Sequence, residues 1–349
     1  MADPGRRSIS QIRTEVRAGA LRSRVHAQVE ELVRKEDRNA KPYYEVKVRD
    51  GGDSLSLKAW NSTPQFGIAE ELQPGEGVEI EGEFSLGSFG LDVQRWTLQP
   101  LSETELAALV EGDDATRALN ERDQADLMCL VESITDPRLR ELAMVFFNDF
   151  GPRFLRAAAA RFNHHAFRGG LLRHTAQMMR SAAAIAGAYP RLNRDLLLTG
   201  VLFHDTGKLW EMCPTENGFD MPRELRGELL GHVSIGIELV NSLWRKLPLD
   251  EWKDLTPSSD DVRLHLLHLI ASHHGELQYG APVEPKTAEA IALHYVDNLD
   301  ARLEMIFNAY DKQPETSPGM FDRVRALNVA PVRSLPFIAS EPSGNKPEE

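Results

Sequence analysis

The N-terminal hundred residues contain five short runs rich in β-forming residues, separated by turn-forming sequences. The runs cover residues 25–33, 43–49, 54–60, 77–84 and 91–98. The sequences between them, including 39–42, 50–53, 74–76 and 87–90, are rich in Gly, Pro, Asn and Asp, which favour turns. A helical stretch near residues 63–72 separates the third run from the fourth. Five strands with one helix in this position predict an all-β OB-fold barrel over residues 21–100.

After this region, apolar residues recur at helical spacing. Residues 101–150 are interpreted as a helical connector, with helices expected near 127–134 and 137–147. Further helices are predicted at 170–185, 232–240, 262–274 and 287–307; in the 262–274 segment Leu264, Leu267 and Ala271 follow helical spacing. We therefore predict a multidomain chain in which an all-α helical bundle at 151–325 follows the barrel. Residues 1–20 are expected to form a flexible basic arm, and residues 326–349 a flexible tail.

Histidine and aspartate residues are placed at intervals along these predicted helices. An apolar run delivers His204 and Asp205 side by side just before Gly207. Adjacent helical residues point about 100° apart, so both side chains can reach one metal only if the helix ends there. Imidazole nitrogens and carboxylate oxygens are ligands for manganese, iron, cobalt or zinc. The candidate metal ligands are His174, His204, Asp205, His232, His273, His274 and Asp297.

The order of these residues is similar to that of the HD-domain phosphohydrolases. More narrowly, the chain resembles the YhaM-type 3′-to-5′ exoribonucleases over roughly residues 20–310. The motifs that carry the resemblance are HHAFRGGLLRHT at 164–175, HDTGK at 204–208, GH at 231–232, SHHG at 272–275 and LHYVDNLDA at 293–301. One departure is Arg173, which stands where the family commonly carries an acidic residue before the histidine. Metal binding is expected to persist there without a neighbouring carboxylate at that position.

The resemblance implies two divalent metal ions, with manganese expected and iron or cobalt as alternatives. It assigns one ion to His174, His204, Asp205 and Asp297, and the other to Asp205, His232, His273 and His274. Two ions about 3.5–4 Å apart can hold a hydroxide and the phosphoryl oxygens together. Asp205, which would bridge the ions, and Lys208, one turn further on, are the predicted catalytic residues. The implied activity is 3′-to-5′ exonucleolytic hydrolysis of single-stranded RNA, with single-stranded DNA as a second candidate substrate.

Several neighbouring residues have two open interpretations. His164 and His165 are candidate contacts to a substrate phosphate, or else caps of the following helix. His294 and Asp300 either orient metal ligands or form the polar face of a helix. Isolated histidines such as His26 are expected to be solvated or packed.

Aromatic residues in the β region are candidate contacts to nucleic-acid bases, since single strands stack on exposed rings. The alternative is that they fill the core of a small barrel. The candidates are Tyr43, Tyr44, Trp60, Phe84, Phe89 and Trp96, of which Tyr44 and Trp60 are the predicted substrate contacts.

Composition narrows the class of protein. The 349-residue chain has two cysteines, Cys129 and Cys213, too few for a disulfide framework or a cysteine zinc site. The N-terminal residues lack the apolar core of a signal peptide, and no run approaches the roughly 18 apolar residues of a membrane span, so a cytoplasmic protein without a membrane partner is expected. The net charge of −13 argues against nucleic-acid binding through general basic charge. Basic residues are nevertheless clustered early, at Arg6, Arg7, Arg13, Arg17, Arg22 and Arg24.

Two other functions compete with the exonuclease. The metal motif alone fits a phosphohydrolase of nucleotides or cyclic dinucleotides, because it does not name the leaving group. A binding module with a decayed HD site is disfavoured by the complete ligand set. The attached barrel favours a polymer over a free nucleotide, and homo-oligomer formation is left open.

Overall fold

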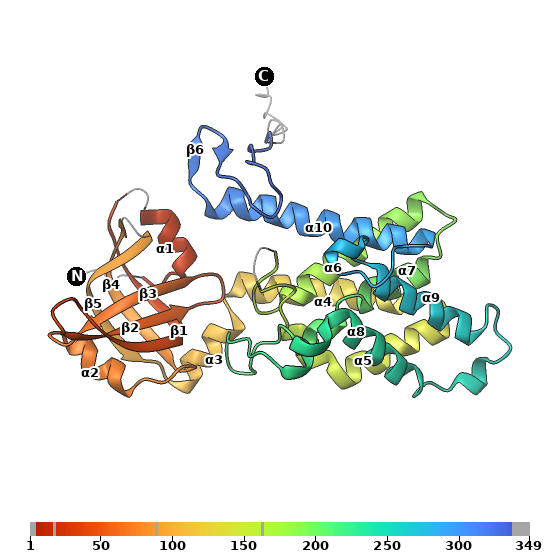
Figure 1. Ribbon diagram of the computed structural model, residues 1–349, viewed down its shortest axis with the longest axis horizontal. Coiled ribbons are helices and arrows are strands. Elements are labelled where there is room, and N and C mark those ends of the chain that lie inside the picture. Colours follow the sequence, from red (N-terminus) through yellow and green to blue (C-terminus); the bar gives the residue numbers. More distant parts are fainter. Residues whose placement is uncertain (1–4, 17–18, 88–89, 162–163, 337–349) are drawn as a thin grey trace, which may run out of the picture. The chain divides into compact units, whose positions relative to one another are not determined.

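The computed structural model describes residues 5–16, 19–87, 90–161 and 164–336. The chain divides into two compact units, residues 1–301 and 302–349. In the first unit a β-rich region is followed by a series of helices (Figure 1). Of the helices in these described ranges, none combines the length and the apolar character that a bilayer crossing needs.

A five-stranded antiparallel sheet forms the N-terminal part of the first unit. Its strands are β1 (Leu21–Glu36), β2 (Pro42–Arg49), β3 (Ser54–Trp60), β4 (Gly77–Gly87) and β5 (Gly90–Pro100). Their hydrogen-bonded order is β3-β2-β1-β4-β5, and helix α2 (Pro64–Glu71) connects β3 to β4. The long β1 pairs with β4 through its first half and with β2 through its second. The five predicted strands and the helix between the third and fourth are confirmed.

Alternating side chains on these strands form the core of the sheet. Val25, Ala27, Val46, Val48 and Ile80 are fully buried, because successive side chains of a strand point to opposite faces. The two end strands of the order, β3 and β5, also contact each other. A closed OB-type barrel is compatible with this arrangement and stays a prediction.

A short helix occupies part of the segment that was predicted to be a flexible arm. Helix α1 (Ile9–Glu15) begins with a capping box formed by Ser8 and Gln11, and it buries Ile9 and Ile12 completely in the core of the sheet. The backbone N–H of Ile9 donates to the Asp50 carboxylate at 2.6 Å. Residues 9–15 are therefore part of the β domain, and the flexible-arm prediction is wrong for them; Arg17 lies outside the described residues.

The remainder of the first unit is helical. The α-helices are α3 (Glu103–Glu111), α4 (Asp114–Glu132), α5 (Pro137–Arg156), α6 (Gly170–Ala188), α7 (Arg194–Phe203), α8 (Leu225–Trp244), α9 (Ser259–Ser272) and α10 (Ala288–Lys312). The predicted helices at 170–185, 232–240, 262–274 and 287–307 fall on α6, α8, α9 and α10. The prediction of a β domain followed by a helical region is thus confirmed.

The segment interpreted as a connector contributes to the helical core. Leu127 and Val131 of α4 are fully buried, as are Phe146 and Phe154 of α5, in the same cluster as the apolar residues of α6 and α7. The helices predicted at 127–134 and 137–147 are parts of these longer helices. The core of the helical region therefore starts in α4, before the expected boundary at residue 151.

A buried glutamine joins the sheet to the helical region. The Gln28 side chain of β1 donates to the carbonyl of Asn217 at 3.1 Å and accepts from the backbone N–H of Phe219 at 2.8 Å. Its amide also donates to the carbonyl of Gly75 at 2.7 Å. One side chain thus fixes the 217–219 loop against the sheet.

The second unit contains the last turns of α10 and a small hairpin. Strands β6 (Glu315–Ser317) and β7 (Met320–Phe321) pair antiparallel. Phe321 is buried against Tyr310, and the Arg333 guanidinium lies over both rings. Residues 326–336 of the expected tail are part of this structure, since the Phe321 N–H donates to the carbonyl of Pro331; residues 337–349 lie outside the described residues.

Candidate metal centre

Asp205 lies where helix α7 ends. The helix stops at Phe203, His204 caps it, and a short 3₁₀ helix, η2 (Thr206–Trp210), follows Asp205. As predicted, the helix end lets adjacent His204 and Asp205 side chains approach one place: His204 Nε2 is 3.2 Å from Asp205 Oδ2. Both residues are buried.

The two carboxylate oxygens of Asp205 face different histidines. Oδ2 lies 3.2 Å from His204 Nε2 and 3.7 Å from His174 Nε2. Oδ1 lies 3.5 Å from His232 Nε2 and 3.7 Å from His273 Nε2. A carboxylate between two pairs of imidazole nitrogens has the disposition that a bridging ligand needs.

Asp297 of α10 completes the set around His174. Its Oδ1 is 3.4 Å from His174 Nε2. The structure therefore gathers His174, His204, Asp205 and Asp297, from α6, the end of α7 and α10, in one place.

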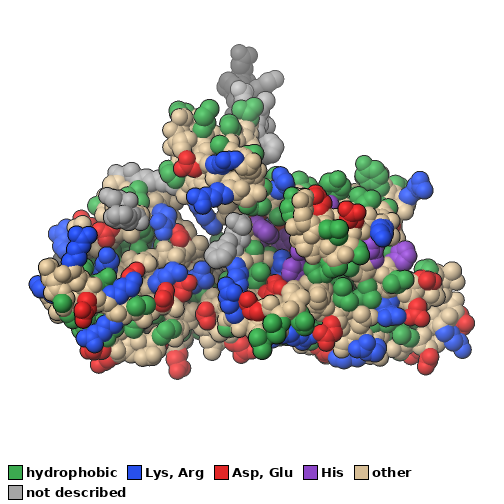
Figure 2. All heavy atoms as spheres, viewed as in Figure 1, with side chains coloured by type: hydrophobic (Ala, Val, Ile, Leu, Met, Phe, Trp, Pro, Cys, Tyr) green, Lys and Arg blue, Asp and Glu red, His purple; other side chains and the backbone are tan. Residues whose placement is uncertain are grey.

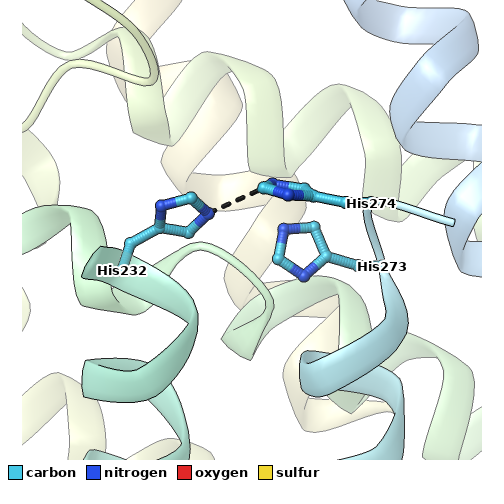
Figure 3. A group of neighbouring side chains, drawn as sticks. All are labelled: His232, His273 and His274. Carbon is cyan, nitrogen blue, oxygen red and sulfur yellow. Dashed lines mark hydrogen bonds between the residues drawn. The ribbon is translucent and has the colours of Figure 1, made fainter. Parts of the chain in front are cut away.

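The second set consists of His232, His273 and His274 (Figure 3). His232 and His274 point toward each other, with 3.2 Å between their Nε2 atoms, and His273 lies beside them. His232 directly follows Gly231, whose φ of 70° breaks α8, while His273 and His274 follow the end of α9. The kink at Gly231 and the end of α9 thus place these rings.

The opposite ring nitrogens are held by protein groups. Nδ1 of His204 and Nδ1 of His273 each lie 2.7 Å from a backbone carbonyl three residues earlier in the chain. A nitrogen facing a carbonyl must donate, so in the neutral ring Nε2 is left as the lone-pair atom. His174 Nδ1 lies 2.7 Å from Asp300 Oδ2. Such outer contacts fix ring orientation at metal sites.

Glu211 is a functional candidate that the sequence did not reveal. Its Oε2 is 3.3 Å from His232 Nδ1. Glu211 therefore orients the His232 ring, as Asp300 orients the His174 ring. Asp205, Lys208 and Glu211 recur at intervals of three through η2, a weak signal that the motifs alone did not single out.

Unpartnered buried atoms show that the residues suit cations. Within the described part of the chain, Nε2 of His174, His204 and His273 and Oδ1 of Asp205 are buried without a hydrogen-bond partner. Leaving one buried polar group unsatisfied costs about 1–3 kcal/mol. Each of the four atoms lies within 3.7 Å of an atom of another candidate ligand, where divalent ions would satisfy them.

The electrostatics of the first set also suit a cation. Burial would raise the pKa of Asp205, but the Lys208 ammonium and the His204 ring outweigh it and hold this pKa well below its usual range. Burial would lower the pKa of His174, but the Asp297 and Asp300 carboxylates raise it to about 10. The excess of negative charge around His174 is what a metal ion would neutralise.

Two histidines of the second set, His273 and His274, are held neutral instead. Burial, together with the nearby His204 ring, lowers the pKa of His273 well below its usual value. Burial and His232 lower the pKa of His274 as well. Metal ligation requires neutral imidazole, so these rings are prepared for it.

Lys208 points at the bridging candidate. Its Nζ donates to Asp205 Oδ2 at 2.5 Å, and the side chain is largely buried. The predicted positive charge is therefore next to the metal ligands, with Asp205 as its partner in this structure.

His164 and His165 lie beside the first set. His165 is buried and its Nε2 is 2.9 Å from Asp300 Oδ2, the same oxygen that faces His174. The His164 ring centroid is 6.1 Å from that of His174, and burial lowers its pKa to about 4. Helix α6 is capped by Gly169 without a side-chain hydrogen bond, so the structure contradicts the alternative that either histidine caps it.

Four further residues can now be placed. Asp300 orients His165 and His174, and His294 Nδ1 lies 2.9 Å from the carbonyl of His273, so both contact the ligand shell. Arg173, which departs from the family pattern, faces Asp123 at 3.5 Å and lies over the Phe167 ring. The carboxylate that orients His174 comes from α10 instead of the preceding position. His26, expected to be solvated or packed, pairs with Glu79 in the sheet.

The aromatic candidates of the β domain fall into different environments. Phe84 is fully buried in the core of the sheet, so a base-stacking role is wrong for it. Tyr44 and Trp96 are half-buried and pack against this core, and Phe89 lies outside the described residues. Tyr43 and Trp60, paired across β2 and β3 with ring centroids 4.6 Å apart, are half-buried.

Comparison with known families agrees with this geometry. Residues 171–302 match the family model of the HD domain, and the match spans the chain from α6 to α10 that carries all seven candidate ligands. HD domains are typically metal-dependent hydrolases. The helical region therefore carries an HD domain, and its cluster of histidines and aspartates indicates a metal-dependent phosphohydrolase.

Proposed function

We propose that this protein is a metal-dependent 3′-to-5′ exonuclease that hydrolyses the phosphodiester bonds of single-stranded RNA, and of single-stranded DNA as a second substrate. The observation that carries the proposal is the Asp205 carboxylate, whose two oxygens face two separate histidine sets. A two-ion site of this kind is a recurrent solution for cleaving phosphodiesters.

In this proposal the first ion is held by His174, His204, Asp205 and Asp297, and the second by Asp205, His232, His273 and His274. The ions, manganese in the first instance, would supply a hydroxide nucleophile and neutralise charge on the phosphoryl oxygens. Their ligands come from five helices, α6 to α10, or the residues that directly follow them, so the packing of those helices sets the spacing of the two sites.

The chain's own charged groups would position the phosphate. Lys208 lies next to the carboxylate that both ions would share, so its ammonium can turn to a phosphoryl oxygen once Asp205 ligates metal. His164 and His165, which lie beside His174, are the proposed contacts to the scissile or the neighbouring phosphate.

The attached β domain supports a polymeric substrate. The Tyr43 ring is half-buried beside Trp60, and the Lys58 ammonium lies 5.7 Å from the Tyr43 ring centroid. Half-exposed rings beside a cation suit stacked bases and their phosphates; Tyr44 and Trp60 are proposed to take part. On the face shown in Figure 2, basic and acidic side chains alternate and histidines reach the surface of the helical region, so binding would depend on local contacts.

The test is a product ladder. Single-stranded RNA labelled at its 5′ end is incubated with the protein and Mn²⁺, and we expect stepwise shortening of the labelled strand. A 3′-labelled strand should release labelled mononucleotide at once. Asp205→Ala should lose metal and hydrolysis together while its circular dichroism stays helical, because the shared ligand sets the metal spacing. Asp254→Ala, on an exposed turn of the helical region, is the matched control.

Other outcomes lead to other functions. Hydrolysis of mononucleotides or cyclic dinucleotides without any shortening of RNA would replace the exonuclease by a nucleotide phosphohydrolase. Normal turnover by Asp205→Ala would contradict the two-metal assignment itself.

A further inference from the structure

A cavity of about 590 Å³ lies within the first unit, between the β sheet and the loop that precedes α6. Its walls come from the start of α1, the turn at 50–52 between β2 and β3, the segment joining α3 to α4, and residues 167–169. Among the described residues that line it, none is a candidate metal ligand. The cavity is therefore distinct from the metal centre.

The cavity offers both guanidinium groups and an aromatic ring. Arg6 lines it with an exposed side chain, 3.5 Å from His26 Nδ1. Arg173 lines it too, and its guanidinium lies 5.1 Å from the centroid of the Phe167 ring. A base that packs on a ring next to a guanidinium, with a phosphate near a second guanidinium, is a common mode of nucleotide recognition.

Two carboxylates in the lining, Asp50 and Asp113, accept hydrogen bonds from backbone N–H groups. Asp50 accepts hydrogen bonds from the N–H groups of Ile9, Gly52 and Asp53. Asp113 accepts from the N–H of Thr116 as the cap of α4. Hydrogen bonds from N–H groups stabilise these carboxylates as anions. Arg173 already faces Asp123 at 3.5 Å, so Arg6, whose side chain is exposed, is the guanidinium best placed for a ligand phosphate. Glu111 is the remaining acidic residue of the lining.

Residues 165–167, in the loop before α6, lie between the cavity and the metal centre. On one side His165 bonds Asp300, which also orients His174. On the other side Phe167 lines the cavity, and its ring centroid is 6.1 Å from that of His165. A strand leaving the metal centre across this loop would enter the cavity directly.

Hydrogen bonds also fix the part of the lining around Phe219 and Arg168. Phe219 lines the cavity, and its N–H is held by the Gln28 side chain of β1. Arg168 donates to the carbonyls of Thr215, Glu216 and Gly218. The cavity is thus preformed rather than created by ligand binding.

We propose that this cavity binds a nucleotide of the single-stranded substrate away from the scissile bond, with its base against Phe167 and its phosphate at Arg6. The strand then runs from the metal centre over the loop before α6 and along the edge of the β domain. This inference rests on the proposed function, and it assigns the cavity to a strand in preference to a free nucleotide.

Binding to the full-length protein tests the proposal without turnover. A fluorescent single-stranded RNA of about 12 nucleotides and, separately, AMP are titrated in EDTA, and hydrolysis of bis-p-nitrophenyl phosphate is measured with Mn²⁺. The variants are Arg6→Glu, which reverses one charge, and Gly51→Trp, which fills the cavity from a position where an added Cβ meets only Phe219, at 3.7 Å. Arg191→Glu, on an exposed turn that does not line the cavity, is the matched control.

We expect both cavity variants to bind the RNA about tenfold more weakly, while Arg191→Glu stays within about twofold of the natural protein. Arg6→Glu should also reduce the slope of affinity against salt concentration by about one. Hydrolysis of the small diester should be unchanged in all three variants, because the metal centre is intact.

Three results would overturn the proposal: unchanged RNA affinity in Arg6→Glu, a loss in Arg6→Glu that Gly51→Trp does not share, or a loss of AMP binding with RNA binding unchanged. The last result would assign the cavity to a free nucleotide. Failure of the proposed function is read separately, from the RNA ladder of the natural protein, because the binding assay contains no metal.

Discussion

At the scale of single residues, a substitution of Lys208 distinguishes stabilisation of phosphate charge from metal binding. Its ammonium lies 2.5 Å from Asp205 Oδ2, but a protonated lysine cannot itself ligate a metal. We expect Lys208→Ala to keep both ions and to hydrolyse RNA about 10²–10³-fold more slowly, as when one preorganised donor is removed. Metal analysis and single-turnover rates on the same sample measure both effects.

Lys208→Arg is the matched control for this prediction. It keeps the charge and should recover part of the rate. Loss of metal together with rate in Lys208→Ala would assign the lysine a structural role in holding Asp205, and an unchanged rate would show that it acts on neither metal nor substrate.

Glu211 and Asp300 are expected to tune the two metal sites separately. Glu211 contacts His232 Nδ1, and Asp300 contacts His174 Nδ1, so each orients a ligand of a different ion. Glu211→Gln and Asp300→Asn should each weaken binding at one site by about 10–100-fold and leave the other occupied. Isothermal titration of the metal-free protein with Mn²⁺ would resolve one weakened and one unchanged site; equal weakening of both sites in either variant would contradict this division.

Most of the candidate metal ligands could be predicted from the sequence because they lie in a recognisable local pattern. His204, Asp205, His232 and His273 sit where an apolar helical run meets a glycine, so their chemistry and the helix break appear together. Glu211 has no such signal. Its role depends on how η2 packs against α8, which no local pattern encodes.

At the scale of elements, the packing of η2 against α8 holds the two ligand sets together. A Cβ added at Gly207 would lie 1.9 Å from the backbone carbonyl oxygen of His232. Gly207→Ala must therefore push η2, with Asp205, away from the start of the second part of α8. We expect about 1–3 kcal/mol of destabilisation and a loss of metal, measured by urea unfolding and metal analysis.

Gly187→Ala is the matched control at this scale. Gly187 lies near the end of α6, and an added Cβ there meets nothing within 4 Å. Replacing this helical glycine should stabilise the protein by about 0.5–1 kcal/mol with unchanged metal content. A Gly207→Ala protein as stable and as metal-rich as this control would show that the close approach is not required.

Helices and strands with a clear sequence pattern were predicted, and those with a weak pattern were missed. The five strands were predictable because β-forming residues fill each run and turn-forming residues separate the runs. Helix α1 was missed because its seven residues bury only Ile9 and Ile12 inside an arginine-rich stretch. The share of α4 and α5 in the helical core was missed because charged residues interrupt their apolar faces, and only the tertiary contacts of Leu127 and Phe154 reveal it.

At the scale of the whole molecule, the proposed division of labour depends on the connection between sheet and helices. The Gln28 side chain bonds the carbonyl of Asn217 and the N–H of Phe219 while its backbone belongs to β1. It is buried, and Phe219 beside it lines the cavity proposed for the strand. This contact could not be predicted from the sequence, because a glutamine in a strand carries no information about a loop 189 to 191 residues away.

Gln28→Ala should therefore uncouple binding of the strand from chemistry at the metals. The substitution leaves the Phe219 N–H and the Asn217 carbonyl without this partner, at a cost of about 1–3 kcal/mol in stability, and it loosens the wall of the cavity. We expect hydrolysis of bis-p-nitrophenyl phosphate to stay unchanged, since no metal ligand moves, while long single-stranded RNA is degraded more slowly through a raised KM. Gln99→Ala, on the exposed face of β5, controls for loss of a glutamine from the sheet. Equal loss of activity on both substrates would mean that Gln28 supports the helical fold itself, and unchanged RNA degradation would show that the β domain acts without this connection.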